Sequence, residues 1–510
     1  MTAPLVIAID ASTTACKALV FGADGRLVAE ARAPITLANP EPDGWEQDAE
    51  EWWDATERAL AGAVRALDEP GAVRAVALTH QRETFVLTDR SSTPLRPALT
   101  WMDARCRREV EAAVAALGAE RLHEVTGKPP CTTPSLYKLI YLLKREPALR
   151  AARPMMADVH AFLVRRLTGR WATSLASADP LGLVDLRARD WSDELLALAG
   201  LDRDQLPALV EPGEQLGALA RELAERLGLP AGVPVIAGAG DGQAAGLGAG
   251  LAGPERAYLN LGTAIVSGVC SREYLLSRAF RTMMGAEPGT YFLESDLRGG
   301  TFTLDWLAKG WLGRGRAALD ELEREASSLP PGSDGLVLLP YWNGVMDPYW
   351  NDDATGVTLG WHGAHRPAHL YRAILEGIAF EARLHLESLE RTTRHHVAEL
   401  IVMGGGSRSE LWCQVLADVT GRRVTRAGSA EATALGAAIL AAVGSGVHPE
   451  LAAATRAMTS LGARFAPGDH QPLYDVYYRD VYAGLYESLA ARLDALAALR
   501  RRANAAHSAG

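Results

Sequence analysis

The sequence predicts an α/β protein built from two domains that share one topology. With 510 residues, the chain is longer than a single hydrophobic core usually serves, so two large domains are expected. An apolar strand over residues 5–9 runs into the polar stretch 10–14, and a second strand follows from Ala18. The same order of apolar strand, Gly-Thr turn and further strand recurs over residues 257–270. This internal repeat indicates two similar domains.

The composition favours a soluble enzyme of the cytoplasm. The apolar fraction of 48% and the charged fraction of 22% are those of a globular protein. A net charge of −10 disfavours nucleic-acid binding. The five cysteines are odd in number and widely spaced, which argues against a disulfide framework or a structural zinc site. We find no signal peptide and no window that predicts a membrane-spanning helix.

Strands and helices alternate along the whole chain. Asp24-Gly25 predicts a hairpin turn, and apolar residues at helical spacing from Trp52 to Leu67 predict a helix. A strand over 73–78 ends in the polar run 79–84. Further strands are expected at 336–340 and 400–403, and further helices at 302–312, 366–389, 409–419, 431–443 and 475–502.

One carboxylate stands out because it follows a strand. The apolar strand 233–237 leads into a glycine loop that contains Asp241, and a helix is expected over 244–251. An acid presented at the end of a strand is a candidate general base. Asp-Gly is also a common turn dipeptide. The phosphate-type loops elsewhere in the chain favour the catalytic interpretation.

Two other segments suit phosphate and a metal ion. In the turn after the first strand, hydroxyls and backbone N–H groups of residues 12–14 can bind phosphate, and Asp10 suits Mg²⁺. An ordinary polar hairpin turn is the alternative. The glycine run 404–406 lies between a strand and a helix, where a nucleotide can approach the helix N-terminus. This run does not fit the G-x-G-x-x-G fingerprint of a strand–helix unit with a downstream acid, which argues against a nicotinamide-dependent oxidoreductase. No G-x-x-x-x-G-K-[ST] motif occurs in the sequence, which argues against a P-loop enzyme.

The polar run after the strand 73–78 suggests a polyhydroxy ligand. Gln81, Arg82 and Glu83 together supply the donors and acceptors that sugar hydroxyls require. A surface ion pair between Arg82 and Glu83 is the alternative. Trp101 and Asp103 form a further polar cluster at a strand end.

With these residues in place, the chain resembles the FGGY carbohydrate kinases over residues 4 to about 490. The resemblance implies two actin-like (ribonuclease H-like) domains around a central cleft. The first, 1–246, is expected to bind sugar and the second, 247–490, to bind ATP, with a polar tail over 491–510. The resemblance rests on the order and spacing of residues 10–14, 45–47, 81–83, 101–103, 240–241, 261–263, 348–350, 370–380 and 404–407.

The resemblance also implies a role for each matching residue. Asp241 matches the catalytic base, and Asp10 matches the acid associated with Mg²⁺. The residues that match the ATP site are Thr13, Thr14, Lys17, Gly262, Thr263, Gly405 and Ser409. The residues assigned to the sugar pocket are Gln81, Arg82, Glu83, Trp101, Asp103, Asp241 and Gln243.

The chain departs from the family pattern in three places. Ser12 replaces a usual glycine, so a positive φ there would be strained. The second loop continues Gly-Thr-Ala instead of Gly-Thr-Ser, and the stretch 356–369 is longer than the usual motif.

The substrate is the part that the motifs define least. The segment 81–84 looks like that of glycerol kinases, whereas xylulokinases usually carry Met-His in place of Arg82-Glu83. Residues 241–243 and 191–217 look closer to the xylulokinase-like branch. We therefore expect a ketopentose such as D-xylulose, with a glycerol, tetritol or tetrulose kinase as the alternative. A non-catalytic sugar or nucleotide sensor is a third possibility, against which the intact Asp10 and Asp241 argue. A homodimer is expected, with no nucleic-acid or membrane partner.

Overall fold

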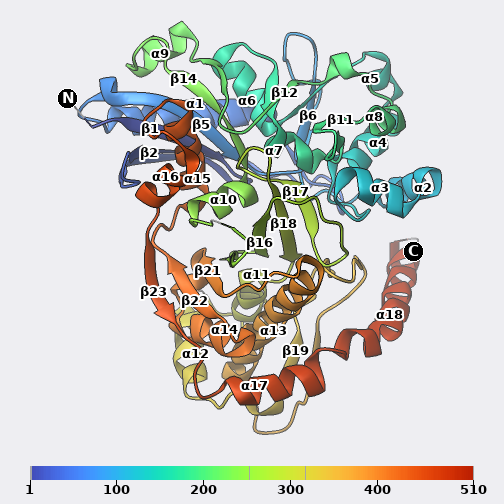
Figure 1. Ribbon diagram of the computed structural model, residues 1–510. Coiled ribbons are helices and arrows are strands. Elements are labelled where there is room, and N and C mark those ends of the chain that lie inside the picture. The colour runs from blue at the N-terminus through green and yellow to red at the C-terminus, as the bar shows by residue number, and fades with distance from the viewer. Residues whose placement is uncertain (1–2, 252, 316, 509–510) are drawn as a thin grey trace.

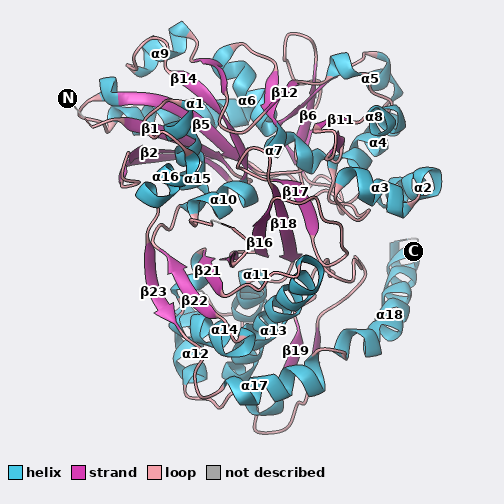
Figure 2. Ribbon diagram, viewed as in Figure 1, coloured by secondary structure: helices cyan, strands magenta, loops and turns pink. Residues whose placement is uncertain are grey.

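The computed structural model describes residues 3–251, 253–315 and 317–508 and shows two α/β domains, one above the other in Figure 1. The first domain is built on a six-stranded sheet in the order β13-β14-β5-β1-β2-β3. Strands lie at its centre and helices on its outside (Figure 2). The strands are β1 (Leu5–Ala11), β2 (Ala15–Gly22), β3 (Leu27–Pro34), β5 (Val73–His80), β13 (Gln215–Ala218) and β14 (Pro234–Gly240).

The second domain has a seven-stranded sheet in the order β17-β18-β16-β15-β21-β22-β23. Its strands are β15 (Arg256–Leu261), β16 (Ile265–Ser271), β17 (Arg281–Met284), β18 (Tyr291–Leu297), β21 (Glu399–Met403), β22 (Arg423–Ala427) and β23 (Leu461–Phe465). A smaller sheet joins β4 (Glu46–Gln47), β7 (Ala98–Leu99), β6 (Phe85–Thr88) and β8 (Met155–Asp158) beside the first domain.

The two large sheets share one topology. In the first, β1, β2 and β3 form an antiparallel meander, and β5 and β14 add parallel to β1. In the second, β15, β16 and β18 form the meander, and β21 and β22 add in parallel. The predicted repeat is confirmed, and this strand order is that of the expected ribonuclease H-like fold. The two phosphate-type loops occupy equivalent places, between the first two strands of each sheet.

Helices cover both faces of the first sheet because its strands alternate apolar side chains between faces. Ile7 and Ile9 of β1 pack under α1 (Ala49–Arg65) and α6 (Val159–Thr168). Val6 and Ala8 face the opposite side, which α15 (Ala432–Gly444) covers. A helix from the range assigned to the second domain therefore packs on the first sheet. The domain boundary at residue 246 stays a prediction. The packing of helices on the sheets does not follow it.

Two helices lie between the sheets. The backbones of α10 (Asp241–Gly248) and α15 approach so closely that a Cβ on Gly248 would lie 1.8 Å from the Ala432 carbonyl oxygen. A Cβ on Gly436 would lie 1.9 Å from the carbonyl oxygen of Ala244. Only glycine allows this contact. The outer face of the second sheet is covered by α13 (Pro367–Thr393) and α14 (Glu410–Thr420), with α12 (Ala317–Ser327) beside α13.

The structure corrects two expectations. The stretch expected as a glycine loop before Asp241 is strand, because β14 stays paired with β5 through Gly240, and the helix begins at Asp241 itself. The single helix expected over 475–502, with a polar tail after residue 490, is divided: α17 (Gln471–Tyr477) ends early, and α18 (Leu485–Ser508) runs on through the tail, with Leu493 and Ala497 buried. Apolar side chains at i and i+4 anchor that helix on one face.

The remaining helices complete the two outer layers. They are α2 (Arg107–Leu117), α3 (Ala119–Thr126), α4 (Ser135–Arg145), α5 (Pro147–Ala151), α7 (Leu175–Ala178), α8 (Asp193–Ala199), α9 (Arg221–Leu227), α11 (Thr301–Asp305), α16 (Leu451–Met458) and α17 (Gln471–Tyr477). The short strands are β9 (Ala172–Ser174), β10 (Val184–Asp185), β11 (Asp190–Trp191), β12 (Ala208–Val210), β19 (Val337–Leu339) and β20 (Val357–Leu359).

Candidate active site

Asp241 begins α10 at the level where the two domains meet. One of its oxygens, Oδ1, accepts from Arg82 Nε and from the Gly242 amide, each at 2.8 Å. The side chain is 45% exposed, so the other oxygen is open to a ligand. Partial loss of hydration between the two domains raises the pKa of Asp241, and the Arg82 guanidinium partly offsets this. An oriented carboxylate with one free oxygen is the geometry that a general base requires.

Arg82 joins the two domains at this point. Its Nη1 donates to both carboxylate oxygens of Glu294, at 3.0 and 2.8 Å. Arg82 follows β5 of the first sheet, and Glu294 lies on β18 of the second. The Arg82 side chain is 7% exposed and that of Glu294 is fully buried. The Arg82–Glu294 pair therefore spans the domains with little solvent screening, and Arg82 connects it to Asp241.

Glu83 turns away from its neighbour. Its backbone has a positive φ of 52°, and its carboxylate accepts from Arg281 Nη1 at 2.9 Å. Arg281 Nη2 in turn donates to Glu294 Oε1 at 2.5 Å. The alternative of a surface ion pair between Arg82 and Glu83 is wrong, because both side chains are buried and each binds a residue of the second domain.

The two amides predicted for the sugar pocket turn inward. Gln81 Nε2 donates to Gln47 Oε1 at 2.7 Å, and Gln243 Nε2 donates to the Ala176 carbonyl at 3.1 Å. Gln81 is 2% exposed and Gln243 is 1% exposed. Both amides bind groups inside the protein, and Gln243 Oε1 also accepts from Arg82 Nη1 at 3.5 Å. The structure therefore gives them supporting contacts in place of the predicted sugar contacts.

Trp101 and Asp103 have different surroundings in the structure. Trp101 is 39% exposed, and its indole N–H donates to Thr13 Oγ1 at 3.0 Å, beside the first phosphate-type loop. Asp103 is buried and accepts from the Trp45 amide at 3.1 Å and from Arg105 Nε at 2.9 Å. The structure places Trp101 where a ligand can reach it. It gives Asp103 an anchoring contact in place of the predicted sugar contact.

The first loop closes without the strain that Ser12 suggested. Ser12 is not among the described residues with a positive φ, and its amide and hydroxyl both donate to the Ala15 carbonyl, at 3.0 and 2.8 Å. Thr14 is exposed and Thr13 is half-buried. Lys17 is the predicted phosphate contact. Its Nζ lies 2.7 Å from Oε2 of Glu431, the N-cap residue of α15.

Asp10 has the environment of a cation site. The side chain is 8% exposed, and burial raises its pKa to about 7, with Lys17 opposing and the charges of Asp241 and Glu431 adding to the rise. No described hydrogen bond reaches its carboxylate. A divalent cation would relieve this repulsion, and carboxylate oxygens are the ligands that Mg²⁺ prefers. The residues present therefore fit Mg²⁺.

We expect Asp10→Asn to stabilise the fold in Mg²⁺-free buffer at neutral and alkaline pH. Because its pKa is about 7 in the fold and lower when unfolded, ionised Asp10 disfavours the folded state. The stabilising effect should grow as pH rises from about 4 to 7 and then level off. Thermal melts of both proteins at a series of pH values check this. A difference in Tm that is constant with pH would contradict it.

The second loop and the glycine run present open backbone. The carbonyl of Gly262 accepts from the Thr301 amide at 2.8 Å, and Thr263 is exposed. Gly405 is also exposed, and a Cβ added there would meet no atom within 4 Å. Ser409 caps α14 by accepting from the Trp412 amide at 3.0 Å and donates its hydroxyl to Glu323, so the structure gives it a capping role in place of a nucleotide contact.

Gly405→Val tests the nucleotide assignment cleanly, because the protein itself has room for the side chain and the backbone does not have a positive φ. We expect ATP binding to weaken at least about tenfold, which is about 1.4 kcal/mol, with an unchanged Tm. Calorimetric titration with ATP measures the loss. Gly71→Val is the matched control, since Gly71 is exposed with equal room. Unchanged affinity in Gly405→Val would remove Gly405 from the site.

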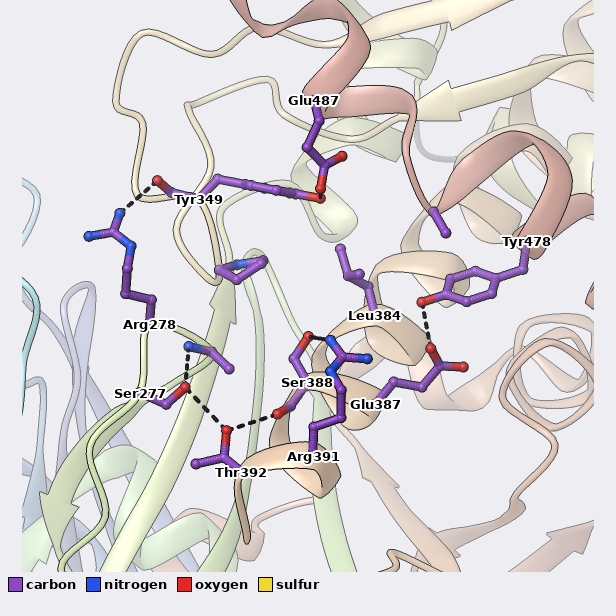
Figure 3. A pocket seen from close by; sticks show the side chains of 13 residues that line it. Ser277, Arg278, Tyr349, Leu384, Glu387, Ser388, Arg391, Thr392, Tyr478 and Glu487 are labelled. Carbon is purple, nitrogen blue, oxygen red and sulfur yellow. Dashed lines mark hydrogen bonds between the residues drawn. The ribbon is translucent and has the colours of Figure 1, made fainter. Parts of the chain in front are cut away.

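A cavity of about 450 Å³ lies elsewhere in the second domain and contains none of these residues (Figure 3). Its walls come from residues 277–279 just before β17, the loop residues 348–349, the C-terminal half of α13 and the segment 478–487. Its tyrosines bind its acids, as in the 2.9 Å contact between Tyr349 and Glu487 and the 3.1 Å contact between Tyr478 and Glu387. The candidate active site is therefore the polar cluster around Asp241 and not this cavity.

Comparison with known proteins agrees with this geometry. The model of the N-terminal domain of the FGGY family of carbohydrate kinases matches residues 5–248, and that of the C-terminal domain matches 257–445. The chain belongs to the FGGY family of carbohydrate kinases. This confirms the predicted family and the predicted class of enzyme, an ATP-dependent sugar phosphotransferase.

Individual relatives cover nearly all of this FGGY kinase. The xylulose kinase of Escherichia coli strain K12 is 33% identical over 447 residues, 86% of this chain and 90% of the relative. A glycerol kinase of Thermococcus gammatolerans is 32% identical over 86% of this chain and 88% of its own. The crystal structure of xylulose kinase from Rhodospirillum rubrum matches with a TM-score of 0.88 and 30% identity, over 96% of this chain and 100% of the other.

Sequence reasoning missed the second-domain side of the FGGY kinase site. Glu294 and Arg281 contact Arg82 and Glu83 from β18 and β17, and Glu431 contacts Lys17. The acid that directly follows the apolar residues 291–293 of β18 was a signal for Glu294. No described helix of the kinase is long and apolar enough to cross a membrane.

Proposed function

We propose that this kinase transfers the γ-phosphate of ATP to a hydroxyl of a ketopentose such as D-xylulose. The observation that carries the catalytic assignment is the Asp241 carboxylate, with one oxygen fixed by Arg82 and the Gly242 amide and the other open. The choice of a ketopentose rests on similarity to xylulose kinases at 33% and 30% identity. In this proposal the first domain binds the sugar and the second binds ATP.

The chemistry follows from the positions of the polar groups. Asp241 takes the proton of the attacking hydroxyl, which contributes about 10²- to 10⁴-fold to the rate. Arg82 keeps the carboxylate oriented, and its charge stabilises the ionised form that accepts the proton. Exclusion of water between the domains prevents hydrolysis of ATP in place of transfer to the sugar.

The phosphates of ATP would lie at the two equivalent loops. Thr13 and Thr14 offer hydroxyls and backbone N–H groups in the first loop, and Gly262 and Thr263 offer them in the second. Lys17 would add a positive charge once it leaves Glu431. Asp10 would hold Mg²⁺, which neutralises phosphate charge when bound. In-line positioning of hydroxyl and phosphate supplies most of the remaining acceleration.

A second candidate function is phosphorylation of glycerol or of a four-carbon polyol or ketose. The specific observation is the Gln81-Arg82-Glu83 segment, which looks like that of glycerol kinases, together with 32% identity to such enzymes. The small acceptor would meet the same base. The two candidates therefore differ in pocket size and not in mechanism.

A screen of ATP consumption across ketopentoses, aldopentoses, glycerol and tetritols separates the candidates. We expect the highest kcat/KM with a ketopentose, because xylulose kinases are 33% identical to this chain over 86% and 88% of its length. Highest kcat/KM with glycerol or a tetritol would support the second candidate. If no acceptor in the screen leads to ATP consumption, the result would favour a non-catalytic sugar or nucleotide sensor.

A homodimer and a cytoplasmic location stay predictions. Sedimentation of the purified protein tests the predicted homodimer.

A further inference from the structure

The strand that leads to Asp241 contains one extra residue. In the pairing of β14 with β5, Ile236 lies opposite Ala77 and Ala239 lies opposite Thr79. Two residues, Ala237 and Gly238, therefore lie between these pairs where β5 has one. This is a β-bulge, a feature common next to active sites because it redirects the side chains that follow.

The bulge requires a glycine and a special hydrogen-bond acceptor. A Cβ on Gly238 would lie 1.6 Å from the Leu78 carbonyl oxygen. Ala237 pairs on its other side, where its carbonyl accepts from Gly213 and its amide donates to Glu214, each at 2.8 Å. The Gly238 amide instead donates to His160 Nε2 at 3.2 Å. A buried amide without an acceptor is costly, so His160 makes the bulge tolerable.

Neighbouring groups place the proton of the His160 ring on Nδ1, the nitrogen that does not face Gly238. Thr173 Oγ1 donates to Asp158 Oδ2 at 2.8 Å and therefore accepts from His160 Nδ1–H, at 3.2 Å. Asp158 Oδ1 accepts from the Ala161 amide at 2.5 Å, which caps α6. His160 is fully buried, and burial lowers its pKa far below the usual range, as does the nearby His80. The imidazole is neutral, with Nε2 as the acceptor.

The bulge determines the position of Asp241, three residues after Gly238. Inserting one residue changes the face on which every following strand residue lies. With the bulge, Gly240 pairs with His80 and lies against the Arg82 side chain, where a Cβ would be 2.5 Å from Arg82 Cδ. The helix then begins at Asp241 with its carboxylate on Arg82.

We propose that His160 is a positioning residue for Asp241, acting through the Gly238 amide, with Thr173 and Asp158 setting its tautomer. This proposal rests on the proposed function, in which Asp241 is the base. His160 touches neither sugar nor nucleotide in this role. Its loss should lower kcat more than it raises KM, because a small displacement of the base impairs the transition state first.

The first test compares Thr173→Val with Thr173→Ser. Valine cannot accept from His160 Nδ1–H, so the imidazole loses the contact that fixes its tautomer, whereas serine keeps the hydroxyl. We expect kcat to fall about tenfold or more in Thr173→Val, with KM for sugar and ATP within about twofold, and to stay within about twofold in Thr173→Ser. Equal kcat in Thr173→Val and wild type would overturn the proposal.

A second measurement needs no substrate and so does not depend on the proposed function. Hydrogen exchange of the peptide 234–242, followed by mass spectrometry, should be faster in Thr173→Val and in His160→Phe than in wild type. His160→Gln, whose amide oxygen can still accept, should exchange more slowly than His160→Phe and have the higher kcat. Exchange at the wild-type rate in both Thr173→Val and His160→Phe would refute the Gly238 contact. If wild type phosphorylates no acceptor while exchange rises as expected, the proposed function fails and the bulge contact stands.

Discussion

Replacing Asp241 by asparagine lowers kcat by at least about 10²-fold and leaves sugar affinity within a few-fold. Asparagine has nearly the same shape, and its amide oxygen can take the place of Oδ1, which accepts from Arg82 and the Gly242 amide at 2.8 Å. What it removes is the basic oxygen that is open to the substrate. Steady-state kinetics on the best acceptor give kcat, and calorimetry gives sugar affinity.

The stability of this variant is an internal control. Loss of hydration raises the pKa of Asp241, and only Arg82 and the Gly242 amide favour the ionised carboxylate. We therefore expect little loss of Tm in Asp241→Asn. Near-normal turnover in a folded Asp241→Asn protein would rule out Asp241 as the base and leave the carboxylate a role in orienting Arg82.

The second large effect is that of Arg82→Ala, which should change both stability and sugar binding. Removal of the guanidinium leaves Glu294 buried with Arg281 as its remaining cation. Breaking a buried ion pair from one side costs about 3–5 kcal/mol. If Arg82 also donates to substrate oxygens, KM for the sugar rises at least about tenfold. ATP affinity without sugar should stay unchanged.

Three comparisons separate the two effects of Arg82→Ala. Glu83→Ala should also raise sugar KM at least about tenfold, by the same loss of a buried partner. Combining Arg82→Ala with Glu294→Ala should recover part of the stability, since the buried Glu294 charge is then removed with its partner and Arg281 keeps its ion pair with Glu83. Arg203→Ala, which removes exposed contacts to Asp190 and Asp193, should change neither quantity. A wild-type KM in both Arg82→Ala and Glu83→Ala would exclude these residues from the sugar site.

Local patterns were enough to predict the first two strands of each sheet, whereas β17, β18, β22 and β23 of the second sheet were not predicted. The apolar runs that became β1 and β15, and the Gly-Thr turn after the second, predicted the repeat because strand and turn signals depend on neighbouring residues. Asp241 and Arg82 were predicted as site residues and do meet, at 2.8 Å, although 159 residues separate them. Their assignment to one site came from the family resemblance more than from any local signal.

The remaining parts of the site depend on contacts that no local pattern encodes. Glu294 lies 212 residues beyond Arg82, and Glu431 lies 414 residues beyond Lys17, so their pairing follows only from the arrangement of the two domains. Gln243 and Asp103 were assigned to the sugar pocket from the family resemblance. Their hydrogen bonds to Ala176 and Arg105 appear only once the chain is folded.

The start of α10 was misplaced for a related reason. Gly238 and Gly240 suggested a loop, yet both lie in β14, where the close approach of β5 and of Arg82 requires glycine. Glycine in a strand often marks a bulge, and this one carries the extra residue before Asp241. A glycine run between a strand and a helix is therefore compatible with a strand that continues to the helix.

The most direct test of the account is ³¹P NMR of the products formed from D-xylulose, ATP and Mg²⁺ by wild type and by Asp241→Asn at equal concentration. With wild type, the account predicts one new phosphate monoester for each ADP and no inorganic phosphate. With Asp241→Asn, it predicts at least about 10²-fold slower ester formation. Equal rates in the two proteins, or ADP and inorganic phosphate without a sugar ester, would contradict it.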